Sequence, residues 1–539
     1  MVNEAFEEQL KSGYTVNEPS VIIGSALLDD VPYNEPRVQL PLSIMNRHGL
    51  VAGATGTGKS TTLQVIAGQL SAAGVPVFIA DIKGDLSGLA APGDMSNPKV
   101  QARCEQLAWE PNVTGHPVEF LSLSGRLGAQ VRATISSFGP ILLGKVLGLN
   151  ETQTSVLSLV FKYCDDNQLP LLDLPDLRTT LQYLGSEAGK PILAEYGGMS
   201  SQSVGVLLRS LANLEQQGAD VFFGEPEFDV RELLRTDASG KGIVSLLELS
   251  DVIDKPVLFS TFILWLLAQL WHTLPELGDP PQPVLVFFLD EAHLLFDGAS
   301  KALLQQIEQT ARLIRSKGVG IYFVTQVPAD VPSSVLAQLG NRVQHALRAF
   351  TPQDADALRK AVRTFPRTEF YDVEQMLQSL GTGEAAVTVL SAKGAPTPIV
   401  ATRLLPPDSR MGALDAAEMQ RMIAMSPLQG RYATAIDRES AHEIITARIQ
   451  AAQEAAATVS PELTGTTAAE MARTAREAQR VAREQERAAQ QAARDQAAAE
   501  RQRQRNLETG MRQAGKVLTS RTGQDLIRGV LGTLFGGKR

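Results

Sequence analysis

The chain has 539 residues, of which 44% are hydrophobic and 20% charged. This length suggests two or three domains with ample material for a buried core, and the composition excludes a disordered or collagen-like chain. The formal net charge of −9 excludes a globally basic surface, although a ring or channel can still concentrate positive charge locally.

The cysteines and the apolar segments indicate the cellular compartment of the protein. The two cysteines, Cys104 and Cys164, match neither a metal site nor a disulfide framework. The acidic N-terminus lacks the basic flank and apolar centre of a signal peptide. The longest apolar run, residues 257–271, is shorter than the ~20 residues that span a bilayer. We therefore expect a cytoplasmic protein with a buried helix at this run.

The expected elements begin with an extended segment at residues 1–45. A first part of the core, residues 46–130, contains a strand, a glycine-rich turn and a helix, then a buried strand and a third strand near residue 120. Residues 131–235 are mostly helical and are interpreted as an insertion. Buried strands return across residues 236–410, at 242–250, 284–292, 319–327, 342–350, 385–392 and 398–405.

Strands that are apolar throughout and separated by helices indicate an α/β fold, with a mainly parallel sheet covered by helices on both faces. Residues 411–450 are predicted to form C-terminal helices. An Ala/Arg/Gln/Glu-rich helix follows at 451–512, either solvated or in a coiled coil with a thin apolar seam. Residues 513–539 are apolar with basic flanks and suit docking on the protein itself, a neighbouring subunit or a membrane surface.

The most specific motif is Gly-Ala-Thr-Gly-Thr-Gly-Lys-Ser at residues 53–60, which satisfies the phosphate-loop pattern. Its glycines let backbone N–H groups face an anion, and the following helix adds its positive end. Lys59 is predicted to reach the β- and γ-phosphates of ATP, and the Ser60 hydroxyl to bind Mg²⁺. A glycine-rich turn with an incidental lysine is the disfavoured alternative. The predicted nucleotide-binding residues are Gly53, Ala54, Thr55, Gly56, Thr57, Gly58, Lys59, Ser60 and Thr61.

A pair of carboxylates follows the buried strand at 284–289. Asp290 and Glu291 stand at its carboxyl end, where an open parallel sheet places its ligands. Asp290 is predicted to hold hydrated Mg²⁺, and Glu291 to orient and deprotonate the water that attacks the γ-phosphate. A solvated strand end is the alternative. His293 either links the nucleotide state to a neighbouring strand or satisfies hydrogen bonds near the site.

Three more polar residues are candidates for catalysis. Gln326 ends the next strand and is predicted to sense the γ-phosphate or its attacking water, with a strand-end cap as the alternative. Arg312 and Arg315, three apart on the preceding helix, share a face. Helix packing should keep them from their own nucleotide, so we predict that one supplies a transition-state cation to a neighbour's site. Surface salt bridges are the alternative.

Residues 290–293 spell Asp-Glu-Ala-His, the name of a family of RNA helicases, but the rest of that family's pattern is missing. The separation from Lys59 is far longer than in that family. The following strand ends in Val-Thr-Gln rather than Ser-Ala-Thr, and the sequence lacks the motif of that family's second nucleotide-binding domain. The match is therefore local.

As a set, HGLVAGATGTGKST, FIADIKGD, FFLDEAH, the arginine spacing before Gly318 and VTQVP resemble the HerA/FtsK superfamily, and residues 426–445 are similar to the C-terminal segment of its bacterial HerA-like group. The resemblance implies a RecA-like core, a hexamer, ATP and Mg²⁺ as ligands, hydrolysis between subunits and movement along double-stranded DNA. It favours Arg315 as the arginine acting in trans. It also matches Asp81 and Lys83 to a motif whose role stays open, with a strand-end cap as the alternative.

One departure from HerA concerns its partner. Only about fifty residues precede the phosphate loop, too few for the N-terminal β-barrel that helps HerA dock its nuclease, which puts a nuclease partner in doubt. The sequence also lacks the membrane-spanning region of FtsK. Two hypotheses remain: a DNA translocase or helicase-like ATPase, and a nucleotide-switched scaffold that recruits a protein or membrane partner through its insertion and C-terminal helix.

Overall fold

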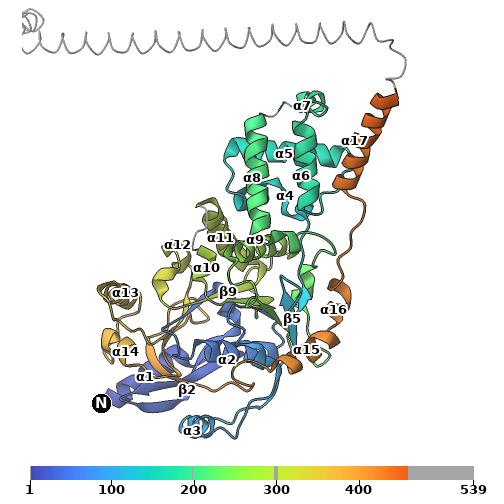
Figure 1. Cartoon of the computed structure of the whole chain (residues 1–539). Helices are drawn as coiled ribbons and strands as arrows, with labels where there is room; N and C mark the ends of the chain where they lie inside the picture. Colours follow the sequence, from blue (N-terminus) through green and yellow to red (C-terminus); the bar gives the residue numbers. More distant parts are fainter. Residues whose placement is uncertain (1, 197, 199, 297–300, 459–539) are drawn as a thin grey trace, which may run out of the picture. The chain divides into compact units, whose positions relative to one another are not determined.

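The computed structural model describes residues 2–196, 198, 200–296 and 301–458 (Figure 1). The chain divides into two units, Met1–Arg448 and Ile449–Arg539, and nearly all of the described residues belong to the first. From residue 459 onward, the predicted charged helix at 451–512 and the terminal segment at 513–539 lie outside the described residues.

A twelve-stranded sheet organises the described part of the chain, in the order β2-β1-β12-β11-β10-β3-β9-β8-β4-β7-β5-β6. The strands from β10 to β6 are parallel, whereas β2, β1, β12 and β11 continue the sheet in antiparallel pairs. The mainly parallel α/β fold predicted from the sequence is confirmed. The strands are β1 Ser20–Leu28, β2 Val31–Pro41, β3 Gly49–Ala52, β4 Val77–Asp81, β5 Val118–Ser122, β6 Ala129–Gln130, β7 Val244–Glu248, β8 Leu285–Leu289, β9 Val319–Thr325, β10 Asn341–His345, β11 Glu384–Thr388 and β12 Val400–Leu404.

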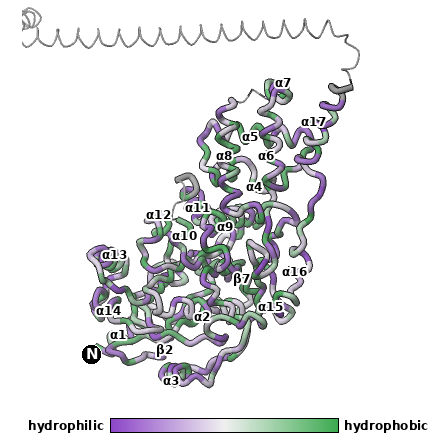
Figure 2. Tube along the Cα trace, in the orientation of Figure 1, coloured by the Kyte–Doolittle hydropathy of each residue, from purple (hydrophilic) through white to green (hydrophobic). Residues whose placement is uncertain are grey.

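Helices cover both faces because successive strand residues point to opposite sides. On one face, Ile79 of β4 and Phe288 of β8 share a buried cluster with Leu63 of α2 (Lys59–Ala72). On the other, the Phe78 ring lies 4.9 Å from that of Phe287 and 6.4 Å from that of Phe262 in α9 (Pro256–Thr273). The central strands are therefore apolar throughout, and Figure 2 shows hydrophobic residues gathered on them.

Helix α9 is the predicted buried helix. By length and composition it could cross a membrane, but 61% of it is buried inside the fold. Trp265 is fully buried, and its indole Nε1–H donates to Ser137 Oγ at 3.0 Å. Helix α9 is thus a core helix, as residues 257–271 predict.

The N-terminal segment differs from the extended conformation expected for residues 1–45. Residues Val2–Tyr14 form helix α1, whose Phe6, Leu10 and Tyr14 side chains are buried at a four-residue spacing. The Tyr14 hydroxyl donates to the carbonyl of Pro398 at 2.7 Å. Since only one residue in each turn is buried and the others are mostly polar or charged, the helical period of this stretch is weak.

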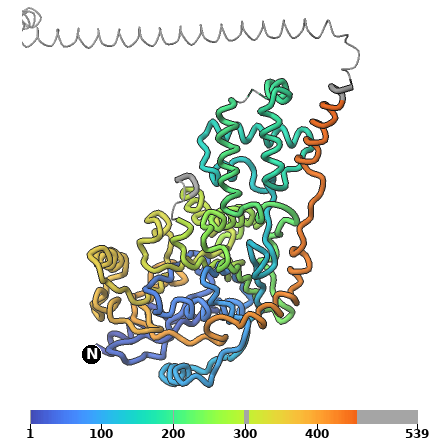
Figure 3. The backbone as a smooth tube through the Cα atoms, viewed as in Figure 1, coloured from blue at the N-terminus to red at the C-terminus, as the bar shows by residue number. Residues whose placement is uncertain are grey.

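The described residues of the predicted insertion, residues 131–235, contain five α-helices and two short 3-10 turns, and this part of the chain gathers beyond the sheet (Figure 3). Capping boxes begin two of them, with Asn150 bonded to Gln153 and Asp173 to Asp176. Helix α4 contacts α5, and α8 contacts both α5 and α6. The helices are α4 Ile135–Val146, α5 Glu151–Asp166, α6 Leu174–Gly185, α7 Lys190–Glu195 and α8 Ser201–Gln216.

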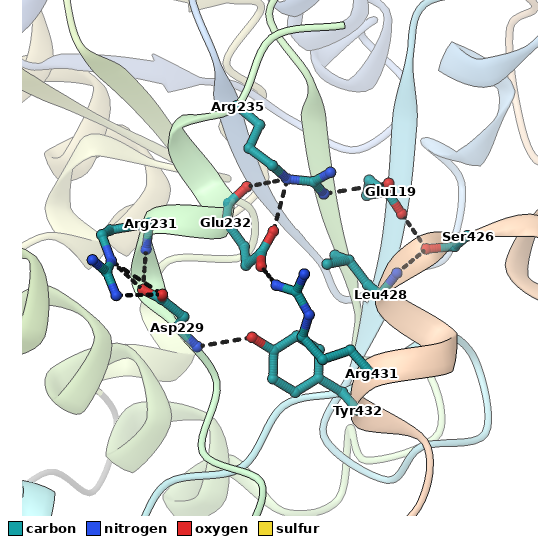
Figure 4. A network of polar contacts seen from close by, with 9 residues as sticks. All are labelled: Glu119, Asp229, Arg231, Glu232, Arg235, Ser426, Leu428, Arg431 and Tyr432. Atoms are coloured by element: carbon teal, nitrogen blue, oxygen red, sulfur yellow. Dashed lines mark hydrogen bonds and ion pairs between the residues drawn. The ribbon is translucent and has the colours of Figure 1, made fainter.

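The segment after the sheet is tied to the core by polar contacts, drawn in Figure 4. Ser426 donates to Glu119 of β5, and Arg431 in α16 (Pro427–Tyr432) pairs with Glu232. Arg235 joins the two carboxylates, at 3.3 Å from Glu119 and 2.9 Å from Glu232. These contacts fasten the segment that resembles the HerA-like C-terminus.

The same segment reaches the insertion. Asp176, which is fully buried in α6, accepts from the Ser440 hydroxyl at 2.5 Å and from the His442 N–H at 2.8 Å. The start of the last described helix is thereby fixed to the insertion. The remaining helices are α3 Pro98–Gln106, α10 His293–Phe296, α11 Lys301–Ile314, α12 Ser333–Leu336, α13 Pro352–Val362, α14 Val373–Ser379, α15 Ala416–Met425 and α17 Ala441–Thr458.

Candidate nucleotide site

The phosphate loop connects β3 to α2 at the carboxyl edge of the parallel strands. The Gly53 N–H donates to the carbonyl of Thr325 at 3.2 Å, and the Ala54 N–H to that of Ala346 at 2.9 Å. A Cβ atom on Gly53 would lie 2.4 Å from the Cβ of His345, and Gly58 has a φ of 108°. Both positions therefore need glycine. The first turn of α2 leaves N–H groups without intrahelical partners, as an anion site requires.

Lys59 is held inside the loop. Its ammonium Nζ donates to the carbonyls of Gly53 at 2.7 Å and Ala54 at 3.2 Å. Burial, followed by the nearby charge of Lys83, lowers the pKa of Lys59. A cavity of about 370 Å³ opens beside the loop, and both lysines line it. Two ammonium groups at one cavity are suited to a highly charged anion.

The carboxylates predicted after β8 lie where the sequence placed them. Asp290 is 4% exposed, and its Oδ2 has no hydrogen-bond partner among the described residues. Burial raises the pKa of Asp290 to about 7, although the charge of Lys83 opposes the shift. Glu291 is 6% exposed and has a φ of 46°, a left-handed conformation that costs a non-glycine residue energy.

The loop after β4 brings a second group of residues to the site. Asp81 accepts the N–H groups of Lys83 at 3.1 Å, Gly84 at 2.8 Å and Leu86 at 2.8 Å, so it caps the strand end. Burial nevertheless raises the pKa of Asp81 to about 6. The Lys83 ammonium lies 2.5 Å from Glu291 Oε1. Asp81 thus has the capping role given as its alternative, whereas Lys83 reaches the predicted base.

Ser60 contacts a further carboxylate, and His293 lies beside Glu291. The Ser60 hydroxyl donates to Asp85 Oδ2 at 3.0 Å. The His293 ring Nδ1 lies 3.3 Å from Glu291 Oε2, at the start of α10. Neither of these two atoms has a hydrogen-bond partner among the described residues, so both roles given for His293 stay predictions.

Gln326 follows β9, which lies between β3 and β8 in the sheet. Its side chain is exposed, whereas the preceding Thr325 is buried and donates to Asp330 Oδ2 at 2.6 Å. The strand order therefore places Gln326 between the ends of the strands that carry Lys59 and Asp290. This is the position that the sensing hypothesis requires.

The two candidate arginines lie at the opposite edge. Helix α11 ends at Ile314, so Arg315 stands in the 3-10 turn before β9 rather than on the same helix as Arg312. Arg312 is exposed, and Arg315 Nη2 lies 3.0 Å from Asp279 Oδ1. Seven residues of β9, at ~3.3 Å each, separate this edge from the phosphate loop. Neither arginine can reach its own phosphate loop.

Two buried residues near the site were missed from the sequence. The His345 Nδ1–H donates to the carbonyl of Thr57 at 3.1 Å, and its Nε2 lies 3.0 Å from Thr62 Oγ1. Burial and the charge of Lys59 lower the pKa of His345 to about 4, so the ring is neutral. Glu248 pairs in register with Asp81, and burial with nearby carboxylates raises its pKa to about 8. Each residue is the last of its strand, but only the strand order shows what it faces.

A second cavity, of about 390 Å³, adjoins the phosphate loop. Arg103 of α3 donates to the carbonyl of Gly383 at 2.8 Å, and the Gly383 N–H donates to that of Thr57 at 3.0 Å. The turn before β11 thus connects α3 to the phosphate loop. The lining includes Gly58, Thr61, Thr62, Arg103, Thr382, Gly383 and Met411.

Comparison with known proteins identifies relatives. The family model described as helicase HerA-like C-terminal matches residues 27–539. The DNA double-strand break repair helicase HerA of Saccharolobus solfataricus is 23% identical over 388 residues, which cover 71% of this chain and 69% of the relative.

Two solved structures are also similar. The bacterial conjugative coupling protein TrwBdeltaN70 has a TM-score of 0.48 and 15% identity, over 73% of this chain and 95% of its own. VirB4 of Thermoanaerobacter pseudethanolicus has a TM-score of 0.46 and 14% identity, over 73% of this chain and 97% of its own.

The family match extends over most of the chain and includes the phosphate loop, the carboxylate pair and Gln326. The chain therefore belongs to the helicase HerA-like C-terminal family and is a P-loop ATPase.

Proposed function

We propose that the protein is an ATP-driven motor that forms a ring of six subunits and moves along double-stranded DNA, with hydrolysis at the interfaces between subunits. Its relationship to a protein named as a DNA repair helicase supports the DNA substrate. The observation that carries interfacial hydrolysis is the position of Arg312 and Arg315 at the edge of the sheet opposite Lys59.

In this proposal, one cavity binds the phosphates of the nucleotide and the other binds its nucleoside. The phosphates occupy the cavity lined by Lys59, Ser60 and Lys83, because N–H groups and ammonium groups converge there. The nucleoside occupies the adjoining cavity beside Arg103 and Met411. The phosphate-loop residues Gly58 and Thr61 line both cavities, so one ligand can extend across them.

Ser60 and Asp290 are suited to hold Mg²⁺. The Asp290 Oδ2 is buried without a partner among the described residues, and the Ser60 hydroxyl lies at the start of α2. The described residues contain no cluster of three metal-ligating side chains, which agrees with an ion whose other ligands are phosphate oxygens and water. When bound, Mg²⁺ neutralises negative charge on the phosphates.

Glu291 is proposed as the general base. Its carboxylate accepts a proton from the water that attacks the γ-phosphate, a role typically worth 10²–10⁴-fold in rate. Gln326 orients that water or contacts the γ-phosphate. Arg315 of a neighbouring subunit supplies the cation that stabilises the transition state, as trans arginines do in other phosphoryl-transfer enzymes.

The second candidate function is a nucleotide-switched assembly scaffold. The net charge of −9 favours it, because a DNA channel needs a local excess of positive charge. In that case the insertion and the C-terminal region bind a protein or membrane partner, and ATP hydrolysis does not depend on DNA.

Mutations at Lys59 and Glu291 should distinguish nucleotide binding from catalysis. We expect Lys59→Ala to weaken nucleotide binding, because the phosphates lose their buried cation. Glu291→Gln should retain ATP binding, with no loss of affinity, and lower turnover at least ~100-fold, because the base is lost. Nucleotide titration and steady-state ATPase assays measure the two effects. Equal loss of binding in both variants would contradict the assigned roles.

The trans arginine can be tested with mixed rings. Arg315→Ala alone should lower turnover about 10³-fold, the lower range for such arginines. Mixtures of Arg315→Ala and Glu291→Gln subunits should regain measurable ATPase activity, since some interfaces combine an intact Glu291 with an intact Arg315. Arg312→Ala is the matched control. Failure of every mixture to regain activity would exclude action in trans.

DNA dependence distinguishes the motor from the scaffold. We expect duplex DNA to stimulate ATP turnover at low salt, with an affinity that falls steeply as salt rises. A chain ending at Ala451 should keep this stimulation if the protein is a motor. A scaffold should instead lose its partner and retain a DNA-independent ATPase activity. A rate of ATP hydrolysis that duplex DNA does not change at low salt would contradict the motor proposal.

A further inference from the structure

Lys83 has a fixed backbone and a partly free side chain. The backbone N–H groups of Lys83 and Gly84 bond to Asp81, so the loop itself is anchored to the strand end. The Lys83 side chain is 38% exposed, and its only salt bridge within the described residues is with Glu291, whose side chain is 8% exposed. A flexible four-carbon stem therefore carries a charge that can move while the loop stays in place.

The contact between Lys83 and Glu291 engages one oxygen of the proposed catalytic base. The ammonium lies 2.5 Å from Glu291 Oε1 and balances the carboxylate's negative charge, while Oε2 has no hydrogen-bond partner among the described residues. Burial alone would lower the pKa of Lys83, but this contact and the charge of Asp290 raise it overall. Lys83 thus remains a cation, and the pair is a charge-assisted hydrogen bond.

Lys83 also lines the proposed phosphate cavity with Lys59 and Ser60. The charge of Lys83 is near enough to Lys59 to contribute to lowering its pKa. Both ammonium groups are bonded to the protein's own oxygens, Lys59 to backbone carbonyls and Lys83 to Glu291. A triphosphate in this cavity brings several anionic oxygens, which compete with one carboxylate for a lysine.

We propose that Lys83 detects the γ-phosphate and controls the catalytic base. Without a γ-phosphate in the site, Lys83 pairs with Glu291. When ATP is bound, the Lys83 ammonium moves to a γ-phosphate oxygen and releases Glu291. The freed carboxylate accepts a proton from water as the new P–O bond forms, the bond to ADP breaks, and the proton later passes to solvent. This inference rests on the proposed use of the cavity for the phosphates.

A simpler role for Lys83 would be to hold Glu291 in position. That role predicts slower turnover on removal of the lysine but no selective change in affinity for the triphosphate. A γ-phosphate contact predicts a change confined to the triphosphate. Binding measurements therefore separate the two without depending on catalysis.

The test measures the dissociation constants of fluorescent ADP and of a fluorescent non-hydrolysable ATP analogue, both with Mg²⁺. We expect Lys83→Ala to weaken the ATP analogue about tenfold and to leave ADP within about twofold, since one charge-assisted contact is lost. Lys83→Arg should keep part of the preference. Lys11→Ala, on the exposed side of α1, is the matched control.

Glu291→Gln provides an arm in which Lys83 stays in place. Removing the carboxylate charge should free the lysine and tighten the ATP analogue several-fold, and this gain should vanish in the Glu291→Gln/Lys83→Ala double variant. Equal effects on both nucleotides, or none, would overturn the role of Lys83 while leaving the nucleotide site intact. If the unaltered protein binds neither nucleotide, the proposed site itself fails.

Discussion

The convergence of parallel strands at one edge of the sheet is the constraint on which the site depends. Because β3, β9, β8 and β4 are neighbours and run in the same direction, their carboxyl ends meet. The phosphate loop, Gln326, the Asp290–Glu291 pair and the Asp81–Lys83 loop follow these four strands in turn. Apolar helices on both faces hold the strands in this order, so the buried core and the chemistry are parts of one arrangement.

Burial gives this edge its electrostatic character. Asp290 and Asp81 have raised pKa values mainly because they are removed from water, and their neighbour Glu248 behaves in the same way. Lys59 and Lys83 are the cations that line the cavity beside these carboxylates in the described structure. A buried carboxylate with a free oxygen favours a cation, and a cavity lined by lysines favours an anion. The edge is therefore suited to a nucleotide that arrives with its metal ion.

Sequence motifs and periodicity predict the elements that carry such a pattern within a short stretch of chain. The phosphate loop, the acidic strand end after β8 and the apolar run of α9 were recognised because each carries its own period or motif. Helix α1 was missed because its buried residues, Phe6, Leu10 and Tyr14, are spread one to a turn among charged residues. The place of β1 in the sheet depends on pairing with the distant strand β12, which no local pattern reports, and β2 follows by pairing with β1.

The same reasoning explains the site residues that were missed. His345 reaches the phosphate loop because β10 lies beside β3, although 286 positions separate it from Lys59 in the chain. The sequence places Lys83 in a motif, but its contact with Glu291 depends on the pairing of β4 with β8. Which residues stand at strand ends follows from sequence, whereas which strand ends meet follows from tertiary packing.

In the proposed mechanism, the carboxyl ends of these strands bind ATP and a neighbouring subunit completes the site. Electron microscopy of the unaltered protein with a non-hydrolysable ATP analogue and Mg²⁺ would show both features together. We predict a ring in which the triphosphate lies against Lys59 and Ser60, with Arg315 of the adjacent subunit facing the γ-phosphate. A nucleotide bound elsewhere, or a site enclosed by one subunit with Arg315 still paired to Asp279 away from any phosphate, would contradict the account.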